Sequence, residues 1–349
     1  MRGARGVAVV AGLVMVAGGL AACGSSSKAV SADAPISGQT ITLYNGQHEQ
    51  TTNALVAAFT KQTGVKVKVR SDDEDVLAQQ IEQEGSHSPA DAFFTENTPP
   101  LARLDESKLL SPVDASTLAA VPTADSASDH NWVGISARVS ALVYNTDKLK
   151  PADLPTSIYG LADPKWKGKL SIAPGETDFA PLVTSIAASR GDDAALAWLK
   201  AIKSNAGSHQ EADNETLVAN VNKGITQIAV INHYYWYRLQ NEVGKSKMHS
   251  ALAYFAPGDD GYLLDVSGAA VVKSSKHQKA AQALLAFLVS KQGETVLASG
   301  DSFEYPLGSN TAANAELPPL SSAKPKAFDL SQIGDGKHAV TLLQKAGLL

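Results

Sequence analysis

Between residues 40 and 94 the spacing of apolar positions alternates between strand period and helix period. The pattern predicts three strands and two helices in alternation, at residues 40–44, 48–63, 65–69, 72–84 and 90–94. Gly64 and Gly85 follow the two helical stretches, where glycine commonly ends a helix. The order strand, helix, strand, helix, strand requires a parallel sheet with crossover helices, which is an α/β fold.

A second unit of the same kind begins near Val139. Its strands are predicted at 141–144, 170–173, 226–231 and 267–272, and its helices at 194–203, 232–243 and 276–290. Residues 164–169 are predicted to form a turn. The chain has no internal repeat and no Walker or dinucleotide glycine motif.

The N-terminus has the pattern of an export signal. Arg2 and Arg5 precede an uncharged apolar stretch over residues 6–20, which is shorter than the roughly 20 residues of a membrane-spanning helix. We therefore predict a signal peptide at residues 1–22. The sequence Leu-Ala-Ala-Cys that ends at Cys23 resembles a bacterial lipobox, which implies lipidation of Cys23. The alternative is an ordinary signal peptide followed by a stray cysteine.

Cys23 is the single cysteine among the 349 residues, so neither an internal disulfide nor a thiolate metal site is expected. Residues 23–39 are rich in Ser, Ala and Gly, and we interpret them as a flexible tether. The net charge is −5, and without Arg2 and Arg5 it is −7, from 28 basic and 35 acidic residues. This balance argues against nucleic acid as a partner and is compatible with binding of a cation.

Polar and aromatic residues follow three of the predicted strands. In open parallel sheets ligands bind at the carboxyl ends of the strands, where His48, Glu96, Tyr234 and Tyr235 are expected. Taken singly, each has an ordinary interpretation: a helix-capping histidine, a helix-start carboxylate, and packing tyrosines. Together they form an oxygen-rich, anionic set that suits a hard trivalent metal ion. The two tyrosines fall in the first turn of a predicted helix, where the helix dipole favours ionised phenols.

With these residues the chain resembles the ferric-binding proteins of bacterial ABC iron transporters, from about Ile41 to Leu349. The segments that carry the resemblance are ITLYNGQHEQ, PADAFFTEN, DPKWKGK, INHYYWYRL, SGAAVVKSSK and FEYPL. The resemblance implies that His48, Glu96, Tyr234 and Tyr235 bind Fe(III). It also implies that an exogenous anion, commonly phosphate, completes the shell.

The resemblance further places Asn97, Asn214 and Asn232 at the anion or in the outer shell. This chain departs from the family at residues 174–178, where Glu176 and Asp178 replace a Ser-Gly-Ala turn that holds phosphate. Two carboxylates would repel phosphate. Carbonate, hydroxide or Glu176 itself therefore remain alternatives for completing the shell.

The architecture implied is a two-lobed periplasmic-binding-protein fold of the class II type. Each lobe is expected to be a mainly parallel sheet flanked by helices, and crossover strands join the lobes. We predict lobe one at residues 40–138 and 265–315, and lobe two at 139–264 and 316–349. The resemblance implies a non-enzymatic, monomeric protein that is anchored outside the cytoplasm by lipid on Cys23 and delivers Fe(III) to an ABC permease and its ATPase.

Two further residues near the predicted site are assigned other roles. His233 is interpreted as structural or outer-shell, and Arg138 as a surface arginine, with contact to an anion in the cleft as the alternative. Two rival functions remain open: a binding protein of the same fold for a polyamine, sugar phosphate or oxyanion, and a secreted metalloenzyme. The sequence lacks the H-E-x-x-H and G-x-S-x-G motifs that would favour an enzyme.

Overall fold

The computed structural model describes residues 35–308, 311–326 and 333–349. The predicted signal peptide, Cys23 and the tether up to residue 34 lie outside these residues. The last two residues of the predicted tether form backbone hydrogen bonds with the folded part of the chain. Gly38 N donates to Gly64 O at 3.0 Å, and Gln39 O accepts from Lys66 N at 2.9 Å.

The described residues form an α/β structure. The strands are β1 (Thr40–Asn45), β2 (Lys66–Ser71), β3 (Ala92–Thr95), β4 (Leu110–Ser111), β5 (Val133–Asn145), β6 (Leu170–Ser171), β7 (Ile228–Asn232), β8 (Ser250–Ala253), β9 (Leu264–Val272) and β10 (Tyr305–Pro306). The α-helices are α1 (Glu49–Thr63), α2 (Glu74–Glu84), α3 (Pro99–Glu106), α4 (Ala115–Leu118), α5 (Ala180–Arg190), α6 (Asp192–Ala206), α7 (Asn214–Asn222), α8 (His233–Val243), α9 (Gln278–Leu288), α10 (Lys291–Ser299) and α11 (Lys337–Ala346).

The strands are arranged in the order β2-β1-β3-β9-β5-β7-β6. β1 pairs in parallel with both β2 and β3, as the strand–helix alternation predicted, and β6 pairs in parallel with β7. β9 is antiparallel to β3 and β5, and β5 is antiparallel to β7. The expected α/β class is confirmed, but the sheet is mixed, since β5 and β9 run against their neighbours.

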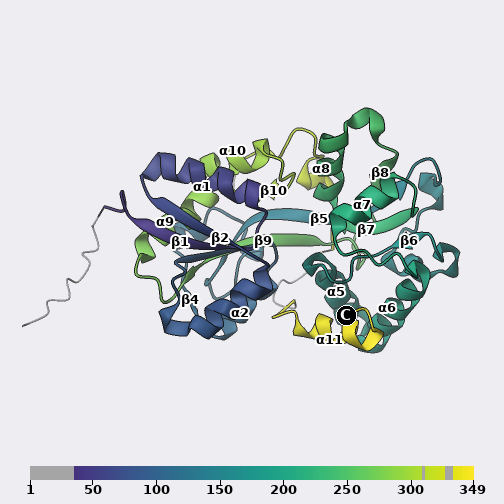
Figure 1. Cartoon of the computed structure of the whole chain (residues 1–349), viewed down its shortest axis with the longest axis horizontal. Helices are drawn as coiled ribbons and strands as arrows, with labels where there is room; N and C mark the ends of the chain where they lie inside the picture. Colours follow the sequence, from purple (N-terminus) through teal and green to yellow (C-terminus); the bar gives the residue numbers. More distant parts are fainter. Residues whose placement is uncertain (1–34, 309–310, 327–332) are drawn as a thin grey trace, which may run out of the picture. The chain divides into compact units, whose positions relative to one another are not determined.

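β5 belongs to two groups of strands. Residues 133–139 pair with β9, whereas residues 140–144 pair with β7 and residues 142–145 pair with β8. In Figure 1, β5 and β9 extend from the side of β1 and β2 toward β7 and β6. This arrangement gives β5 the role expected of a crossover strand.

Helices cover both faces of the sheet. α1 packs against α9 and α10 on one side of β1 and β2, and α2 lies on the other side (Figure 1). α2 also packs against α3. Near β7, α8 contacts α7, and α5 contacts α6 and α11. Aromatic and aliphatic side chains fill the interior, as where Phe59 of α1 meets Phe287 of α9 with 5.6 Å between ring centroids. None of the helices within the described ranges is long and apolar enough to cross a membrane.

Candidate metal centre

The ends of β1 and β3 and the first turn of α8 meet at one place. His48 Nε2 lies 3.2 Å from Glu96 Oε1, and the Tyr234 hydroxyl donates a hydrogen bond to the same oxygen. The Tyr235 ring lies against the Tyr234 ring with 4.2 Å between centroids, and the His48 ring lies 5.4 Å from that of Tyr234. The structure therefore brings together the four side chains that the sequence analysis assigned to the metal.

The loop that carries His48 is fixed on two sides. His48 N donates to Gln47 Oε1 at 2.7 Å, and Gln47 Nε2 donates to Ser267 Oγ on β9 at 3.0 Å. A Cβ added at Gly46 would lie 2.4 Å from Cβ of Glu74 in α2, closer than real side chains approach. This turn therefore requires glycine, because the backbone touches α2 directly.

Glu74, the first residue of α2, holds the segment that follows β3. Glu96 N and Asn97 N donate to Glu74 Oε2 at 2.8 and 3.0 Å, and Asn97 Nδ2 donates to Oε1 at 2.9 Å. Burial, and then the nearby Glu96 carboxylate, raise the pKa of Glu74 well above its usual value. Glu74 therefore positions Glu96 through the backbone.

Arg138 is buried, so the expectation of a surface arginine was wrong. Its guanidinium donates to Glu96 O and to Asn97 Oδ1, and its Nη2 lies 3.3 Å from Asp178 Oδ1. A buried charge needs partners, and these three acceptors supply them. The signal that could have indicated this role is that Arg138 is the one charged residue in the stretch Val133–Asn145.

Asp178 is the residue of this site that the sequence analysis left out of the metal shell. It lies in the short helical turn Thr177–Phe179 that precedes α5. Its Oδ2 accepts hydrogen bonds from the Tyr235 hydroxyl at 3.0 Å and from the Tyr234 hydroxyl at 3.3 Å. The departure from the family pattern at residues 174–178 was the available signal, and it concerned Asp178 more directly than Glu176.

The protein groups by themselves disfavour ionised phenols. Burial, followed by the charges of Asp178 and Glu96, raises the pKa of Tyr234 and Tyr235 well above the ordinary value. The expectation that these phenols would ionise readily is therefore not met by the protein alone, because burial and the nearby carboxylates raise both pKa values. A nearby cation of high charge would reverse this balance.

The histidine and glutamate stabilise each other's charged forms. Burial would lower the pKa of His48, but Glu96 raises it above its ordinary value. Burial would likewise raise the pKa of Glu96, but His48 and Arg138 hold it below the usual range. The pair thus keeps Glu96 ionised at the centre of the site.

Buried carboxylates accumulate around Arg138. Burial raises the pKa of Asp265 to about 7, and Asp178 and Glu96 add to the effect while Arg138 opposes it. Burial also raises the pKa of Glu304, which accepts a hydrogen bond from Ser136 Oγ. The pKa of Asp178 is raised by burial first and by Glu96 second.

The predicted outer-shell asparagines lie at two places. Asn97 Nδ2 donates to Thr177 Oγ1 at 2.9 Å, so Asn97 links the segment after β3 to the turn that carries Asp178. Asn214 and Asn232 line a cavity of about 10 Å³ beside Asp178. All three asparagines are buried.

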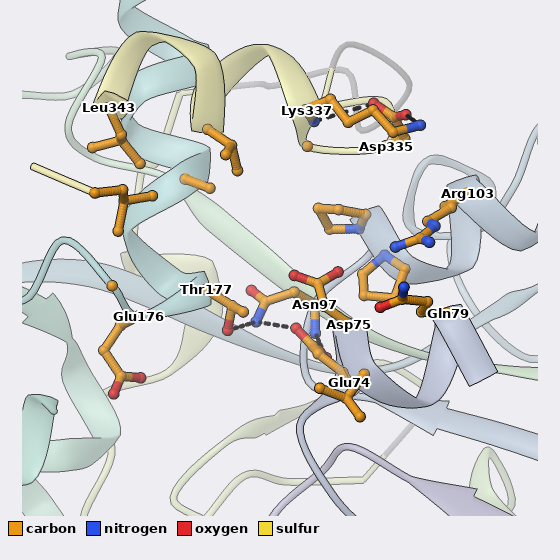
Figure 2. A pocket seen from close by; sticks show the side chains of 18 of the residues that line it. Glu74, Asp75, Gln79, Asn97, Arg103, Glu176, Thr177, Asp335, Lys337 and Leu343 are labelled. Carbon is orange, nitrogen blue, oxygen red and sulfur yellow. Dashed lines mark hydrogen bonds and ion pairs between the residues drawn. The ribbon is translucent and has the colours of Figure 1, made fainter. Parts of the chain in front are cut away.

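Glu176 is near enough to Tyr235 for its charge to raise the pKa of that phenol, after burial, Asp178 and Glu96. It lines a larger cavity of about 490 Å³ together with Glu74, Asn97 and Thr177 (Figure 2). In Figure 2 its carboxylate points away from Asn97 and Thr177. Burial, and then Asp178, raise the pKa of Glu176 to about 8. The structure thus brings Asp178 rather than Glu176 against the tyrosines.

His233 is buried and packs behind the site. Its Nδ1 accepts a hydrogen bond from Val139 N at 3.1 Å, and its ring stacks on Tyr305 with 5.1 Å between centroids. Burial lowers the pKa of His233 to about 4, so the ring is neutral at ordinary pH. It fixes the start of α8 against β5.

The donor set here consists of one imidazole, carboxylates and two phenols. Within the described ranges, no group of three or more His, Cys, Asp or Glu side chains is arranged to hold a metal ion. The hydroxyls of Tyr234 and Tyr235 contact the carboxylates of Glu96 and Asp178, so all four oxygen-bearing side chains are available to one metal ion. Anionic oxygen donors suit hard cations, and phenolates suit a trivalent ion better than a soft one.

The fold, together with this buried cluster of side chains that carry metal-binding atoms, is that of a binding protein for a small solute. The chain belongs to the bacterial extracellular solute-binding proteins, whose family model matches residues 45–295. It is 39% identical to the Fe(3+)-binding periplasmic protein of Serratia marcescens over 98% of this chain and 97% of that protein. It is 38% identical to the major ferric iron-binding protein of a serogroup A strain of Neisseria meningitidis, over 88% and 93% of the two chains.

Among solved structures, iron-bound HitA from Pseudomonas aeruginosa matches with a TM-score of 0.84 and 38% identity. The match covers 88% of this chain and 99% of HitA. The likeness in sequence and in structure thus extends over nearly the whole of the relatives, and the two-lobed fold expected from the sequence is the fold of these proteins.

Proposed function

We propose that this protein binds Fe(III) outside the cytoplasm and delivers it to the permease of an ABC transporter for iron uptake. His48, Glu96, Tyr234 and Tyr235 are the proposed ligands. The observation that carries the proposal is the meeting of two buried phenols with this imidazole and carboxylate at one point.

The electrostatics of the site favour a cation as cargo. Burial first, and neighbouring carboxylates after it, raise the pKa values of Asp178 and Asp265, and a trivalent cation among these groups would favour their ionised forms. The relatives at 38–39% identity carry names that state ferric binding, which supports the same assignment. A metal-free solute such as a polyamine or an oxyanion would leave the tyrosine pair without a role.

Loading requires the phenols to lose their protons. The Tyr234 hydroxyl donates to Glu96 and the Tyr235 hydroxyl donates to Asp178, so each proton lies between oxygen atoms that face the site. Fe(III) would replace these protons. The carboxylates that had accepted hydrogen bonds from the phenols would then face the metal. Binding therefore releases protons and is favoured at higher pH.

We assign the ligands to opposite sides of an interlobe cleft. Lobe one, at residues 40–138 and 265–315, would supply His48 and Glu96, and lobe two, at 139–264 and 316–349, would supply both tyrosines. The pairing of β5 with two strand groups supports this division. Because only a closed cleft assembles all four ligands, iron would stabilise the closed form that the permease recognises.

We further propose that the mature protein begins at Cys23 and is held at the membrane by lipid on that residue. This proposal rests on the lipobox-like sequence and the short apolar stretch before it. The protein would work as a monomer beside the permease and its ATPase.

The test is a titration of the purified, iron-stripped protein with ferric citrate, followed by visible absorption. Phenolate coordination gives Fe(III) a visible band, so we expect a band that saturates at one iron per chain. A polyamine or phosphate that raised the thermal stability while iron gave no band would overturn the proposal in favour of a non-metal solute.

A further inference from the structure

Arg238 lies over the ring of one proposed iron ligand. It follows Tyr234 by four residues in α8, so the two side chains lie on the same face of the helix. Arg238 Cζ is 4.7 Å from the centroid of the Tyr234 ring, which is within the range of a cation–π contact. Tyr234 is completely buried and Arg238 is partly exposed. A substitution of Arg238 therefore disturbs the core less than a substitution of the tyrosine.

The same guanidinium is bonded to a segment outside α8. Arg238 Nε donates to Asp301 O at 3.0 Å, and Asn241 Nδ2 donates to Asp301 Oδ1 at 3.0 Å. Asp301 follows the end of α10, and Figure 1 shows the chain after α10 crossing toward α8. α10 packs against α1, which begins next to His48. Arg238 therefore connects Tyr234 to the part of the fold that carries His48.

Two aromatic contacts extend this interface between α8 and residues 301–305. Tyr237 stacks on Phe303 with 5.5 Å between ring centroids, and His233 stacks on Tyr305 with 5.1 Å. Tyr305 begins β10, which pairs with residues 136–137 of β5. The segment that holds Arg238 is thus itself fixed to the strand group of β1, β3 and β9.

The charge of Arg238 also reaches His48. Burial lowers the pKa of His48, Glu96 raises it above the ordinary value, and Arg238 opposes the effect of Glu96. The His48 ring lies 5.4 Å from the Tyr234 ring. Arg238 therefore lies near one proposed ligand from each of the two strand groups.

The charge balance of a loaded site is compatible with a nearby arginine. Fe(III) with ionised Glu96, Tyr234 and Tyr235 carries no net charge, so the loaded site as a whole does not repel Arg238. Within this neutral set Arg238 contacts the ring of Tyr234 directly, and electrostatic attraction is strongest at the shortest distance. Arg238 should therefore stabilise the loaded site.

From these contacts we propose that Arg238 is a positioning residue of the ferric site, which holds the Tyr234 ring against residues 301–305 and thereby slows the release of iron. The inference rests on the proposed ferric function. It concerns how the ligands are held and not which residues they are.

The test measures iron affinity by visible titration with ferric citrate, and iron release by the decay of the visible band after addition of excess EDTA. Arg238→Ala should weaken affinity about tenfold and speed release by a similar factor, which is the lower end of the range for groups that orient a metal ligand. Arg238→Lys keeps a positive charge near the ring but lacks the planar Nε–H donor, so it should restore affinity only in part.

Arg190→Ala is the matched control. Arg190 Cζ lies 3.9 Å from the ring centroid of Tyr159, and the hydroxyl of that tyrosine donates to Asp260. This variant removes the same kind of contact from a tyrosine that is not a proposed ligand, so its affinity and release rate should equal those of the wild type.

Combination with Tyr234→Phe separates a role through this tyrosine from a general structural role. Positioning acts on the phenol oxygen, so Arg238→Ala should cost less than about twofold in affinity in the Tyr234→Phe background. A merely structural arginine would cost the same factor in both backgrounds. If Arg238→Ala does not fold, as thermal unfolding of the iron-free protein shows, the same comparison with Arg238→Gln decides the matter.

The outcomes separate this inference from the proposed function. Wild-type affinity and release in the Arg238 variants, or an equal loss with and without Tyr234→Phe, would overturn the positioning role while leaving ferric binding intact. A wild type that shows no visible band with ferric citrate would overturn both.

Discussion

Tyr234 and Tyr235 differ in what their hydroxyls contact. Tyr234 reaches both Glu96 and Asp178, whereas Tyr235 reaches Asp178 alone. Tyr234 also lies beneath Arg238, whose Cζ is 4.7 Å from the ring centroid. Phenylalanine at either position keeps the ring packing and removes one anionic donor.

We therefore predict that Tyr234→Phe and Tyr235→Phe each weaken Fe(III) binding by at least about 100-fold, beyond the range typical for groups that only orient a ligand. The visible band should weaken or shift in each variant and vanish when both are combined. Tyr237→Phe, one residue beyond Trp236 in the same helix, is the control and should leave affinity and band unchanged. A double variant that retains the band would exclude these tyrosines as ligands.

His48 should make iron binding sensitive to acid. A protonated imidazole cannot bind metal, and Glu96 raises the pKa of His48 above its ordinary value of about 6.5. Proton competition at His48 should therefore begin above pH 6.5 and strengthen as the pH falls, so that affinity decreases with acidification.

We expect His48→Ala to weaken binding less than loss of a tyrosine, by about 10–100-fold, because it removes a neutral donor. It should also flatten the upper part of the plot of affinity against pH, which spectrophotometric titration at a series of pH values measures. An unchanged pH profile in this variant would remove His48 from the shell.

At the scale of elements, periodicity predicted those helices and strands that have one buried side. α1 and α2 begin within two residues of their predicted starts, since their apolar residues are spaced on one face. α5 was not predicted, because Pro181 to Ile186 are buried in succession and leave no period to detect. The two-residue strands are too short to produce any pattern.

β5 shows why the polar part of the site was harder to predict than its metal ligands. Only residues 141–144 were predicted as strand, although β5 covers Val133–Asn145, because Ser136, Arg138 and Ser140 interrupt the apolar run. These side chains are buried on partners distant in sequence, such as Glu304 for Ser136. His48, Glu96 and the tyrosines follow predictable strand ends, whereas the pairing of Arg138 with Asp178 depends on tertiary packing.

The contact between the loop after β1 and the start of α2 gives a prediction at this scale. A methyl group at Gly46 would meet Cβ and Cα of Glu74 at 2.4 and 2.8 Å. Gly46→Ala should therefore push the His48 loop and α2 apart and destabilise the fold by about 1–3 kcal/mol. Glu74 positions Glu96, so iron affinity should fall as well.

Thermal unfolding and iron titration of Gly46→Ala check this prediction. Gly175→Ala is the matched control, because an added Cβ there meets nothing within 4 Å and the residue lines the nearby cavity. A Gly46→Ala protein as stable as Gly175→Ala would show that the loop tolerates displacement and does not fix His48.

At the scale of the whole molecule, iron should connect segments that are far apart in sequence. His48 and Tyr234 are far apart in the sequence although their rings are neighbours, and they come from different strand groups, which β5 joins. A ligand that binds only the assembled native site stabilises it by about 4 kcal/mol when free ligand exceeds Kd about 1,000-fold.

We accordingly predict that Fe(III) raises the unfolding temperature of the wild type in proportion to the logarithm of its free concentration. Differential scanning calorimetry with buffered ferric chelate measures the shift. The double variant Tyr234→Phe, Tyr235→Phe should show almost none. Equal stabilisation of the wild type and the double variant would indicate that iron binds elsewhere on the chain.

The most direct measurement for the proposed ferric site is anomalous X-ray diffraction at the iron edge from crystals of the iron-loaded protein. We predict one strong anomalous peak within bonding distance of the Tyr234 and Tyr235 phenol oxygens, His48 Nε2 and a Glu96 carboxylate oxygen. A peak bound by other residues, or a loaded crystal without iron between these four side chains, would contradict the proposal.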